Sequence, residues 1–297
     1  MNKVCVIIVN WNGKEHLQKC LPSLQAQSYT DCQIIVVDNG STDGSVDYIK
    51  QSFPNIKIIQ LNENRLFAGG NNAGIQEAFK YPGIKYIALL NNDTIAEKNY
   101  LSEMMRVMEN NPHIGICASK MLSMNNPRNI DSTGHIFGRW GAIIERGHNE
   151  VDNGQYDNKL EVVGACAGAC LYRRTMLEDI GLFDEGFKIY YEDAELSWRA
   201  YKKGWPSRYV PRAIVYHKRG ASSESKRAIR HNNRLLLLRN EITTVKRYGS
   251  ISQKYIYGFR LLLELIQSLY FHLIKAPKNI GITGYLTGLR YFFSKKS

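Results

Sequence analysis

Three carboxylates lie within four positions in the segment 190–199, which reads Tyr-Tyr-Glu-Asp-Ala-Glu-Leu-Ser-Trp-Arg. The residues after them predict a helix, and we expect Asp193 to be its N-cap residue. A carboxylate held at the start of a rigid element can act as a general base, which needs a fixed geometry and hydrogen-bond reach of a hydroxyl group. The alternative is that Glu192, Asp193 and Glu195 only complement the dipole of the helix.

Carboxylates that act on a substrate need other elements to position the substrate beside them. The sequence before residue 190 predicts such elements. Apolar, β-branched runs alternate with segments of helical pattern, which favours an α/β fold with a mostly parallel sheet and helices on both faces. In such sheets ligands bind beyond the carboxyl ends of the strands. Three polar loops directly follow predicted strands and should therefore meet at one edge: Asn10–Gly13 after Val4–Val9, Asp38–Ser45 after Gln33–Val37, and Asn91–Thr94 after Lys85–Leu90.

Each loop offers a chemical group to a ligand. Asp38 can accept a hydrogen bond from a pyrimidine imide or a ribose hydroxyl, although it could equally close its own loop as an Asx-turn. Gly69 and Gly70 allow a close approach of the backbone, and a helix starting nearby offers free N–H groups to an anion; the alternative is a plain turn. Asp93 is a hard oxygen ligand suited to Mg²⁺ or Mn²⁺ on a diphosphate, or else a turn residue.

The composition and the absence of two nucleotide-binding motifs narrow the set of possible functions. Neither GxGxxG after the first strand nor GxxxxGK[ST] occurs, which disfavours a dinucleotide-binding dehydrogenase and a P-loop nucleotide hydrolase. The six cysteines form no CxxC pair, so we expect no zinc site or disulfide framework, and a cytoplasmic protein without a signal peptide. The net charge of +12 is concentrated in residues 226–297, which hold 14 Lys and Arg against two Asp and Glu. A functional boundary is therefore expected near Ser222–Lys226.

The motifs in this order resemble those of family 2 glycosyltransferases. These are inverting enzymes of GT-A fold that use nucleotide-diphosphate sugars, and the nearest branch is the rhamnosyltransferase-like group of bacterial polysaccharide assembly. The resemblance covers about residues 3–240. It rests on Val6–Gly13, Val36–Asp43, Phe67–Asn71, Leu89–Thr94, Gly164–Arg174, Gly181–Glu185, Glu192-Asp193 and Pro211–His217.

The resemblance assigns roles to particular residues. Asp193 matches the catalytic base, and Asp93 matches the last aspartate of the DxD motif, which meets the metal and the diphosphate. The first position of that motif is Asn91, a departure that lowers the local negative charge. His217 matches a histidine that completes the metal site in some relatives, so Asp93 and His217 are the expected ligands of Mg²⁺ or Mn²⁺. The implied donor-site residues are Asn10, Asp38, Gly69, Asn71, Asn92 and Asp93.

The implied reaction is a single displacement from a dTDP- or UDP-linked sugar, with dTDP-rhamnose as the leading donor, to a saccharide acceptor that is lipid-linked. Two alternatives remain. A sugar nucleotidyltransferase should carry a Gly-rich loop with Lys or Arg after its first strand, which Asn10–Gly13 does not. A non-catalytic sugar-binding homologue would lack the base, whereas Asp193 is present. No thiol chemistry is expected of Cys166 or Cys170.

We predict a catalytic domain over residues 1–225, with a nucleotide-sugar-binding half (1–118) and an acceptor and catalytic half (119–225). The stretch 119–160 should form a loop or hairpin region that recognises the acceptor. Residues 226–297 should form a basic, amphipathic helical extension. Arg260 and Glu264 lie within the apolar run Ile256–Ile274, which argues against a membrane span and favours a helix lying on the inner face of the membrane. The alternatives are packing on the catalytic domain or in a homodimer; no motif supports nucleic-acid binding.

Overall fold

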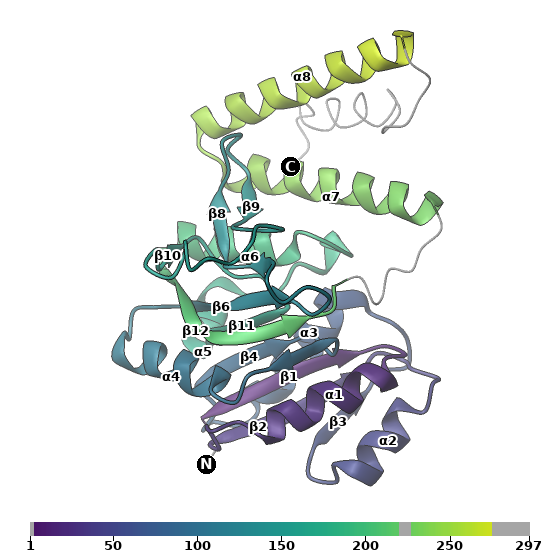
Figure 1. Cartoon of the computed structure of the whole chain (residues 1–297), viewed down its shortest axis with the longest axis vertical. Coiled ribbons are helices and arrows are strands. Elements are labelled where there is room, and N and C mark those ends of the chain that lie inside the picture. Colours follow the sequence, from purple (N-terminus) through teal and green to yellow (C-terminus); the bar gives the residue numbers. More distant parts are fainter. Residues whose placement is uncertain (1–2, 220–226, 275–297) are drawn as a thin grey trace.

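The computed structural model describes residues 3–219 and 227–274, with side chains described for 3–219 and 234–267. Ten strands of this part form one mixed sheet, ordered β10-β12-β6-β11-β4-β1-β2-β3, with β5 on β12 and β7 on β6 (Figure 1). Six strands run parallel: β1 Val4–Asn10, β2 Cys32–Asp38, β3 Lys57–Gln60, β4 Tyr86–Leu90, β6 Ile116–Ser123 and β12 Ser207–His217. Four run against their neighbours: β5 Thr94–Ala96, β7 Ile130–Ser132, β10 Glu161–Val162 and β11 Ala169–Arg173.

Helices cover both faces of the sheet, as the sequence predicts. Alternate side chains of β1 point to opposite faces, because strand side chains have a period of two. Val4, Val6 and Ile8 pack with α1 (Lys14–Gln25), α2 (Ser45–Ser52) and α4 (Tyr100–Asn110). Cys5 and Ile7 pack in the other layer, with α3 (Leu66–Phe79), α5 (Arg174–Ile180) and α6 (Glu192–Lys202).

The antiparallel strand β11 lies between β4 and β6 and reverses the local direction of the chain. Its residues pair with Tyr86–Leu90 on one side and with Ile116–Ala118 on the other. The carboxyl ends of β1, β2, β4, β6 and β12 therefore share an edge with the amino end of β11. The stretch 119–160 contains β7 and the hairpin of β8 (His135–Phe137) and β9 (Ile143–Glu145), so the expected hairpin is present.

Two long helices, α7 (Arg227–Tyr248) and α8 (Ile251–Ile274), follow the sheet and lie on the far side of α6 from it (Figure 1). A third apolar cluster joins them to the rest: Trp198 of α6 and Ile143 of β9 pack with Ile242 of α7 and Leu261 of α8. Within the described residues, no helix combines the length and the apolar character needed to cross a bilayer. The division near residue 225 remains a prediction, although these contacts tie both parts together.

Candidate active site

The loops after β1, β2 and β4 meet at one edge of the sheet. Asn10 and Asp38 are register partners at the ends of adjacent parallel strands. The amide of Asn92 donates to Asn10 Oδ1 at 2.8 Å, and Asn10 Nδ2 donates to Ser41 Oγ at 3.2 Å. Asn10 is fully buried, and its two side-chain hydrogen bonds link the three loops.

Asp38 is only 3% exposed and uses its two carboxylate oxygens differently. Oδ2 accepts from the backbone N–H of Ser41 at 3.1 Å, which is the Asx-turn considered above. Oδ1 is buried and has no hydrogen-bond partner among the described residues. A buried acceptor without a partner costs free energy, and a ligand N–H or hydroxyl would remove that cost. Asp38 therefore both closes its loop and keeps one acceptor for a ligand.

Asp93 and His217 are brought together by the pairing of β5 with β12, in which Thr94 lies opposite His217. Asp93 Oδ1 is 3.2 Å from His217 Nε2, and Asp131 Oδ2 is 2.7 Å from His217 Nδ1. Burial would lower the pKa of His217, but its hydrogen bonds to Asp131 and Asp93 outweigh burial and raise the pKa to about 9. Burial likewise favours a raised pKa for Asp93, but the hydrogen bond from His217 holds it below its ordinary value.

These side chains fit a divalent cation bound with the help of a substrate. Asp93 offers one oxygen, and His217 offers Nε2 once a cation displaces the proton that this nitrogen shares with Asp93. The carboxylate of Asp131 on Nδ1 is the outer contact that commonly orients a metal-binding histidine. Among the described residues, no group of three or more His, Cys, Asp and Glu side chains is placed so that it could hold a metal ion by itself. Mg²⁺ is often held by one or two protein ligands plus substrate phosphates and water, so the donor set matches a cation shared with a diphosphate.

Asp131 is a residue that the sequence did not single out. It is 4% exposed, and besides His217 its carboxylate accepts from Arg219 Nη1 at 2.8 Å. Arg219 also donates to Glu145 of β9 at 3.1 Å. Asp131 thus connects the cation site to the β8–β9 hairpin. It lies in a three-residue strand, which is too short to give a periodic signal in the sequence.

Asp193 contacts the segment that leads into β11, whose amino end shares the edge of the sheet with these loops. Its Oδ2 accepts from the backbone N–H of Ala167 at 3.0 Å. The next residue, Gly168, accepts from the N–H of Asn91 at 2.9 Å. Asp193 is half-buried, so the residue keeps some contact with solvent. The segment Ala167-Gly168 joins the predicted base to the loop that contains Asp93.

The predicted N-cap was wrong. The helix α6 begins at Glu192, and Tyr191 is its N-cap residue, with a left-handed backbone (φ 73°, ψ 0°) and no side-chain cap. Asp193 is the second helical residue, and its Oδ1 accepts from the N–H of Ala194 at 2.8 Å. By residue type aspartate is a favoured cap, but the loop before α6 places the N-cap two residues earlier, at Tyr191.

The neighbouring carboxylates have other environments. Glu195 is 1% exposed and accepts from Arg199 at 2.7 Å and from the Tyr248 hydroxyl at 2.6 Å, so it joins α6 to α7. Glu192 is also buried; burial, followed by the charge of Asp193, raises its pKa to about 8. Of the three acids in this segment, Asp193 is the one with solvent access.

The glycine-rich segment lies inside α3 rather than before it. A Cβ at Gly70 would lie 2.6 Å from Val9 of β1, so its missing side chain permits close packing of helix on sheet. A Cβ at Gly69 would lie 2.8 Å from Arg65 Cβ and 3.2 Å from Glu185 Oε2. The Asn71 side chain donates to the carbonyl of Phe67 in its own helix at 2.9 Å. The binding roles of Gly69, Asn71 and Asn92 remain predictions.

Cys166 and Cys170 have no catalytic environment. Burial raises the pKa of Cys170 to about 12 and that of Cys166 well above its ordinary value. Thiolates, which are the reactive form of cysteine, are therefore disfavoured at both positions.

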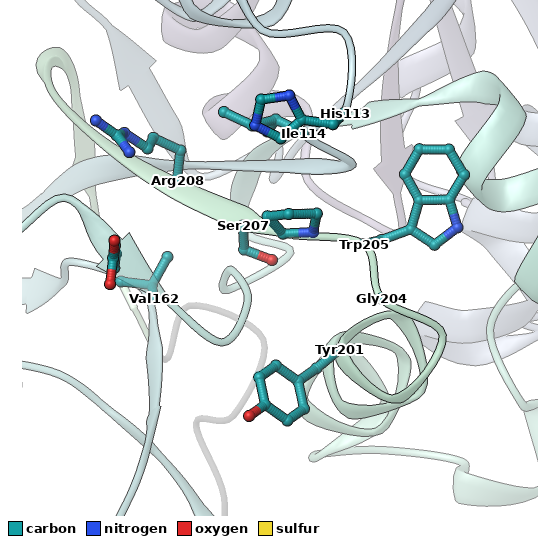
Figure 2. Close-up of a pocket in the computed structure, with 10 residues that line it drawn as sticks. His113, Ile114, Val162, Tyr201, Gly204, Trp205, Ser207 and Arg208 are labelled. Atoms are coloured by element: carbon teal, nitrogen blue, oxygen red, sulfur yellow. The ribbon is translucent and has the colours of Figure 1, made fainter.

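A separate depression of about 460 Å³ lies at the opposite edge of the sheet (Figure 2). Ser207, at the amino end of β12, lies in its wall together with Trp205, Tyr201 and Arg208. His217 is at the other end of the same strand, ten positions away, so the depression is not part of the site described here.

Comparisons with known proteins show the family and the fold. The profile described as "Glycosyl transferase family 2" matches residues 5–181. The chain is 25% identical over 241 residues to the N-acetylglucosaminyl-diphospho-decaprenol L-rhamnosyltransferase of Mycobacterium tuberculosis, covering 73% of this chain and 76% of the relative. It is 25% identical over 224 residues to the poly-β-1,6-N-acetyl-D-glucosamine synthase of Staphylococcus epidermidis, covering 72% of this chain and 49% of that enzyme, so it spans about half of the synthase.

Solved structures show the same fold. TarS 1–349 from S. aureus matches with a TM-score of 0.63 at 18% identity, over 98% of this chain and 80% of that one. GalNAc-T7, solved with UDP, GalNAc and Mn²⁺, matches with a TM-score of 0.66 at 16% identity, over 88% and 50%. These likenesses bear out the GT-A fold predicted from the sequence. The chain belongs to glycosyltransferase family 2.

Proposed function

We propose that this glycosyltransferase is an inverting enzyme in which Asp193 takes the proton of the acceptor hydroxyl. The observation that carries the proposal is the position of Asp193: its carboxylate is held by Ala167 and stays partly open, and the next residue along, Gly168, binds the loop that contains Asp93. A base fixed beside the donor loops has the geometry that general base catalysis requires.

The reaction we propose is one displacement. The acceptor hydroxyl gives its proton to the Asp193 carboxylate while its oxygen forms a bond to the anomeric carbon. The bond from that carbon to the diphosphate oxygen breaks, and the nucleoside diphosphate leaves with the electron pair. Attack from the face opposite the leaving group inverts the anomeric configuration and needs no covalent intermediate on the protein.

The donor is proposed to be a sugar linked to dTDP or UDP. The unpartnered Oδ1 of Asp38 suits the imide N–H that thymine and uracil share, or a ribose hydroxyl. The L-rhamnosyltransferase among the relatives supports rhamnose, whereas a TarS structure and the GalNAc-T7 structure contain UDP. A bound Mg²⁺ or Mn²⁺ would supply positive charge to the departing diphosphate. Asp93 and His217 would hold the cation, and Asp131 would orient the imidazole of His217.

The acceptor is proposed to be a lipid-linked saccharide in cell-surface polysaccharide assembly, reached at the inner face of the membrane. The outer face of α8 supports this location. Tyr257, Leu261 and Leu265 are buried on its inner face, while Tyr255 and Phe259 on the opposite face are 77% and 56% exposed. Both acids of residues 226–297, Glu241 and Glu264, are paired with Arg260, so the excess positive charge is not offset by a free carboxylate. An apolar helix face within a segment of net positive charge suits an anionic bilayer.

The alternatives predict different measurements. A non-catalytic homologue would bind nucleotide sugars without releasing nucleoside diphosphate. A sugar nucleotidyltransferase would release pyrophosphate instead. Family membership favours transfer of the sugar over both.

Asp193→Asn is the direct test. We expect turnover to fall by about 10²–10⁴-fold, because a neutral amide cannot take the proton, while donor affinity stays nearly unchanged. Release of nucleoside diphosphate from a set of dTDP- and UDP-sugars with lipid-linked saccharides would identify the substrates. Lys202→Gln, a change at the exposed last residue of the same helix, serves as a control that leaves the proposed base in place. Near-normal turnover of Asp193→Asn would show that another group is the base.

A further inference from the structure

The loop before Asp193 has a backbone that side-chain-bearing residues rarely adopt. The φ angles are +64° at Lys188, +67° at Tyr190 and +73° at Tyr191. Glycine adopts such angles readily, but none of these three residues is glycine. Non-glycine residues persist in this region only where the surrounding structure holds them. The loop therefore depends on contacts from outside it.

Asn240 of α7 makes those contacts. Its side chain is 1% exposed, and Nδ2 lies 2.9, 3.0 and 2.8 Å from the carbonyl oxygens of Phe187, Ile189 and Tyr190. The left-handed residues turn these carbonyls toward one point, where a single amide group donates to all of them. Arg239, the residue before Asn240, donates to the carbonyl of Gly186 at 2.7 Å and to Asn240 Oδ1 at 2.8 Å, which fixes the orientation of the amide.

The far end of the loop is fixed on β9 and leads directly into α6. The Tyr191 hydroxyl donates to the carbonyl of Ile143 and accepts from its N–H, both at 2.9 Å. The carbonyl of Tyr191 accepts from the N–H of Glu195 at 2.9 Å, the first hydrogen bond of α6. Asp193 follows two residues after Tyr191, so the conformation of the loop decides where its carboxylate lies.

We propose that Asn240 is a positioning residue for the reaction: by holding the carbonyls of Phe187, Ile189 and Tyr190, it fixes the start of α6 and thereby the Asp193 carboxylate. This proposal rests on the proposed role of Asp193 as the base. It also makes α7 a working part of the catalytic unit, although α7 lies beyond the family match, which ends at residue 181.

Asn240→Asp tests the proposal in the full chain, because it keeps the size of the side chain but replaces the donating amide with an oxygen facing three carbonyls. Val245→Ala is the matched control: Val245 is fully buried in the same helix and apolar cluster, and its truncation loosens α7 without removing a hydrogen bond to the loop. Asn240→Ser, which keeps one donor, replaces Asn240→Asp if the latter does not fold.

We expect Asn240→Asp to lower kcat at least about tenfold while the donor KM and the affinity for the nucleoside diphosphate change less than about threefold, since a misplaced base affects the chemical step and not donor binding. Hydrogen exchange of the amides in 188–193 should accelerate in this variant and not in Val245→Ala. The proposal is wrong if the folded variant keeps kcat within about twofold of Val245→Ala, if kcat and nucleotide affinity fall together, or if exchange in 188–193 is unchanged.

Asp193→Asn is measured in parallel to separate the two proposals. If Asp193→Asn is inactive and Asn240→Asp is active, the role of Asn240 fails alone. If Asp193→Asn keeps normal turnover, the proposed role of Asp193 as the base is wrong, and so is the proposed effect of Asn240 on proton transfer. Hydrogen exchange in 188–193 still reports whether Asn240 holds the loop.

Discussion

At the scale of single residues, Asp38 at the end of β2 and Asp93 in the loop after β4 interact with different partners. Asp38 has a buried oxygen without a partner in the described residues, and Asp93 shares a hydrogen bond with His217. This difference fits the proposed roles, in which Asp38 contacts the nucleoside directly and Asp93 contacts the diphosphate through a cation. The two proposed roles can be distinguished experimentally, because only the role of Asp93 depends on a metal ion.

We expect Asp38→Ala to weaken binding of UDP or dTDP with and without Mn²⁺. A hydrogen bond to a charged group contributes about 1.5–3 kcal/mol, which corresponds to about 10–100-fold in Kd.

Asp93→Ala should weaken binding of the same nucleotides only when Mn²⁺ is present. Removal of the metal with a chelator should make the Asp93→Ala variant bind them like the unchanged protein. Titration calorimetry with each variant measures both effects, and the two variants serve as controls for each other. Equal affinities in all four conditions would contradict both assignments.

The meeting of the proposed donor-site residues at one edge could be predicted from the sequence, because each follows a recognisable strand. Asn10, Asp38 and Asp93 stand where an apolar run gives way to polar residues, and parallel strands place such ends together. Asp131 and Asn240 could not be predicted. Asp131 belongs to a strand of three residues, and the contacts of Asn240 exist only because distant loop residues adopt positive φ angles. The cap assigned to Asp193 was wrong for the same reason.

At the scale of elements, α6 connects the sheet to the helical extension. Its first residue, Glu192, is buried beside Asp193, while Glu195 binds Tyr248 of α7. The fold class could be predicted since alternating strands and helices leave a period in the sequence. The antiparallel insertion of β11 could not, because a five-residue buried strand carries no sign of its direction.

Glu192 should make the stability of the protein depend on pH. Its pKa of about 8 in the folded chain lies above the ordinary value near 4.5, so the folded state binds more protons than the unfolded state between these values. The stabilisation is complete below about pH 4.5 and is lost as pH rises toward 8. We therefore expect Glu192→Gln to gain stability over the unchanged protein on going from pH 5 to pH 8, by on the order of 1 kcal/mol or more.

Thermal or urea unfolding of both proteins at a series of pH values measures this difference. Titrating groups that do not interact with Glu192, including His217, are the same in both chains and cancel in the comparison. Glu150→Gln, a change at an exposed acid far along the chain from α6, should leave the pH profile parallel to that of the unchanged protein. A profile of Glu192→Gln that is also parallel would show that Glu192 does not carry the raised pKa.

At the scale of the whole molecule, two different roles are proposed for the basic extension, and a truncation would remove both at once. Its inner surface supports the loop before Asp193 through Asn240, whereas its outer surface exposes apolar side chains of α8. A chain ending near residue 225 would lose both. Substitutions on the outer face of α8 are therefore the sharper test of membrane attachment.

We expect the unchanged protein to co-sediment with vesicles that contain anionic lipid, to bind neutral vesicles less, and to be released by high salt together with mild detergent. Each basic residue near such a surface contributes about 1 kcal/mol, and salt screens this attraction beyond about 8–10 Å. Phe259→Asn combined with Ile266→Asn, two exposed positions of α8, should abolish sedimentation while kcat on a water-soluble acceptor stays unchanged. Val151→Asn, which removes an exposed apolar residue from another surface, should sediment like the unchanged protein. If the unchanged protein ignores vesicles and sedimentation velocity finds a dimer that the α8 variant dissociates, the outer face of α8 is a subunit interface instead.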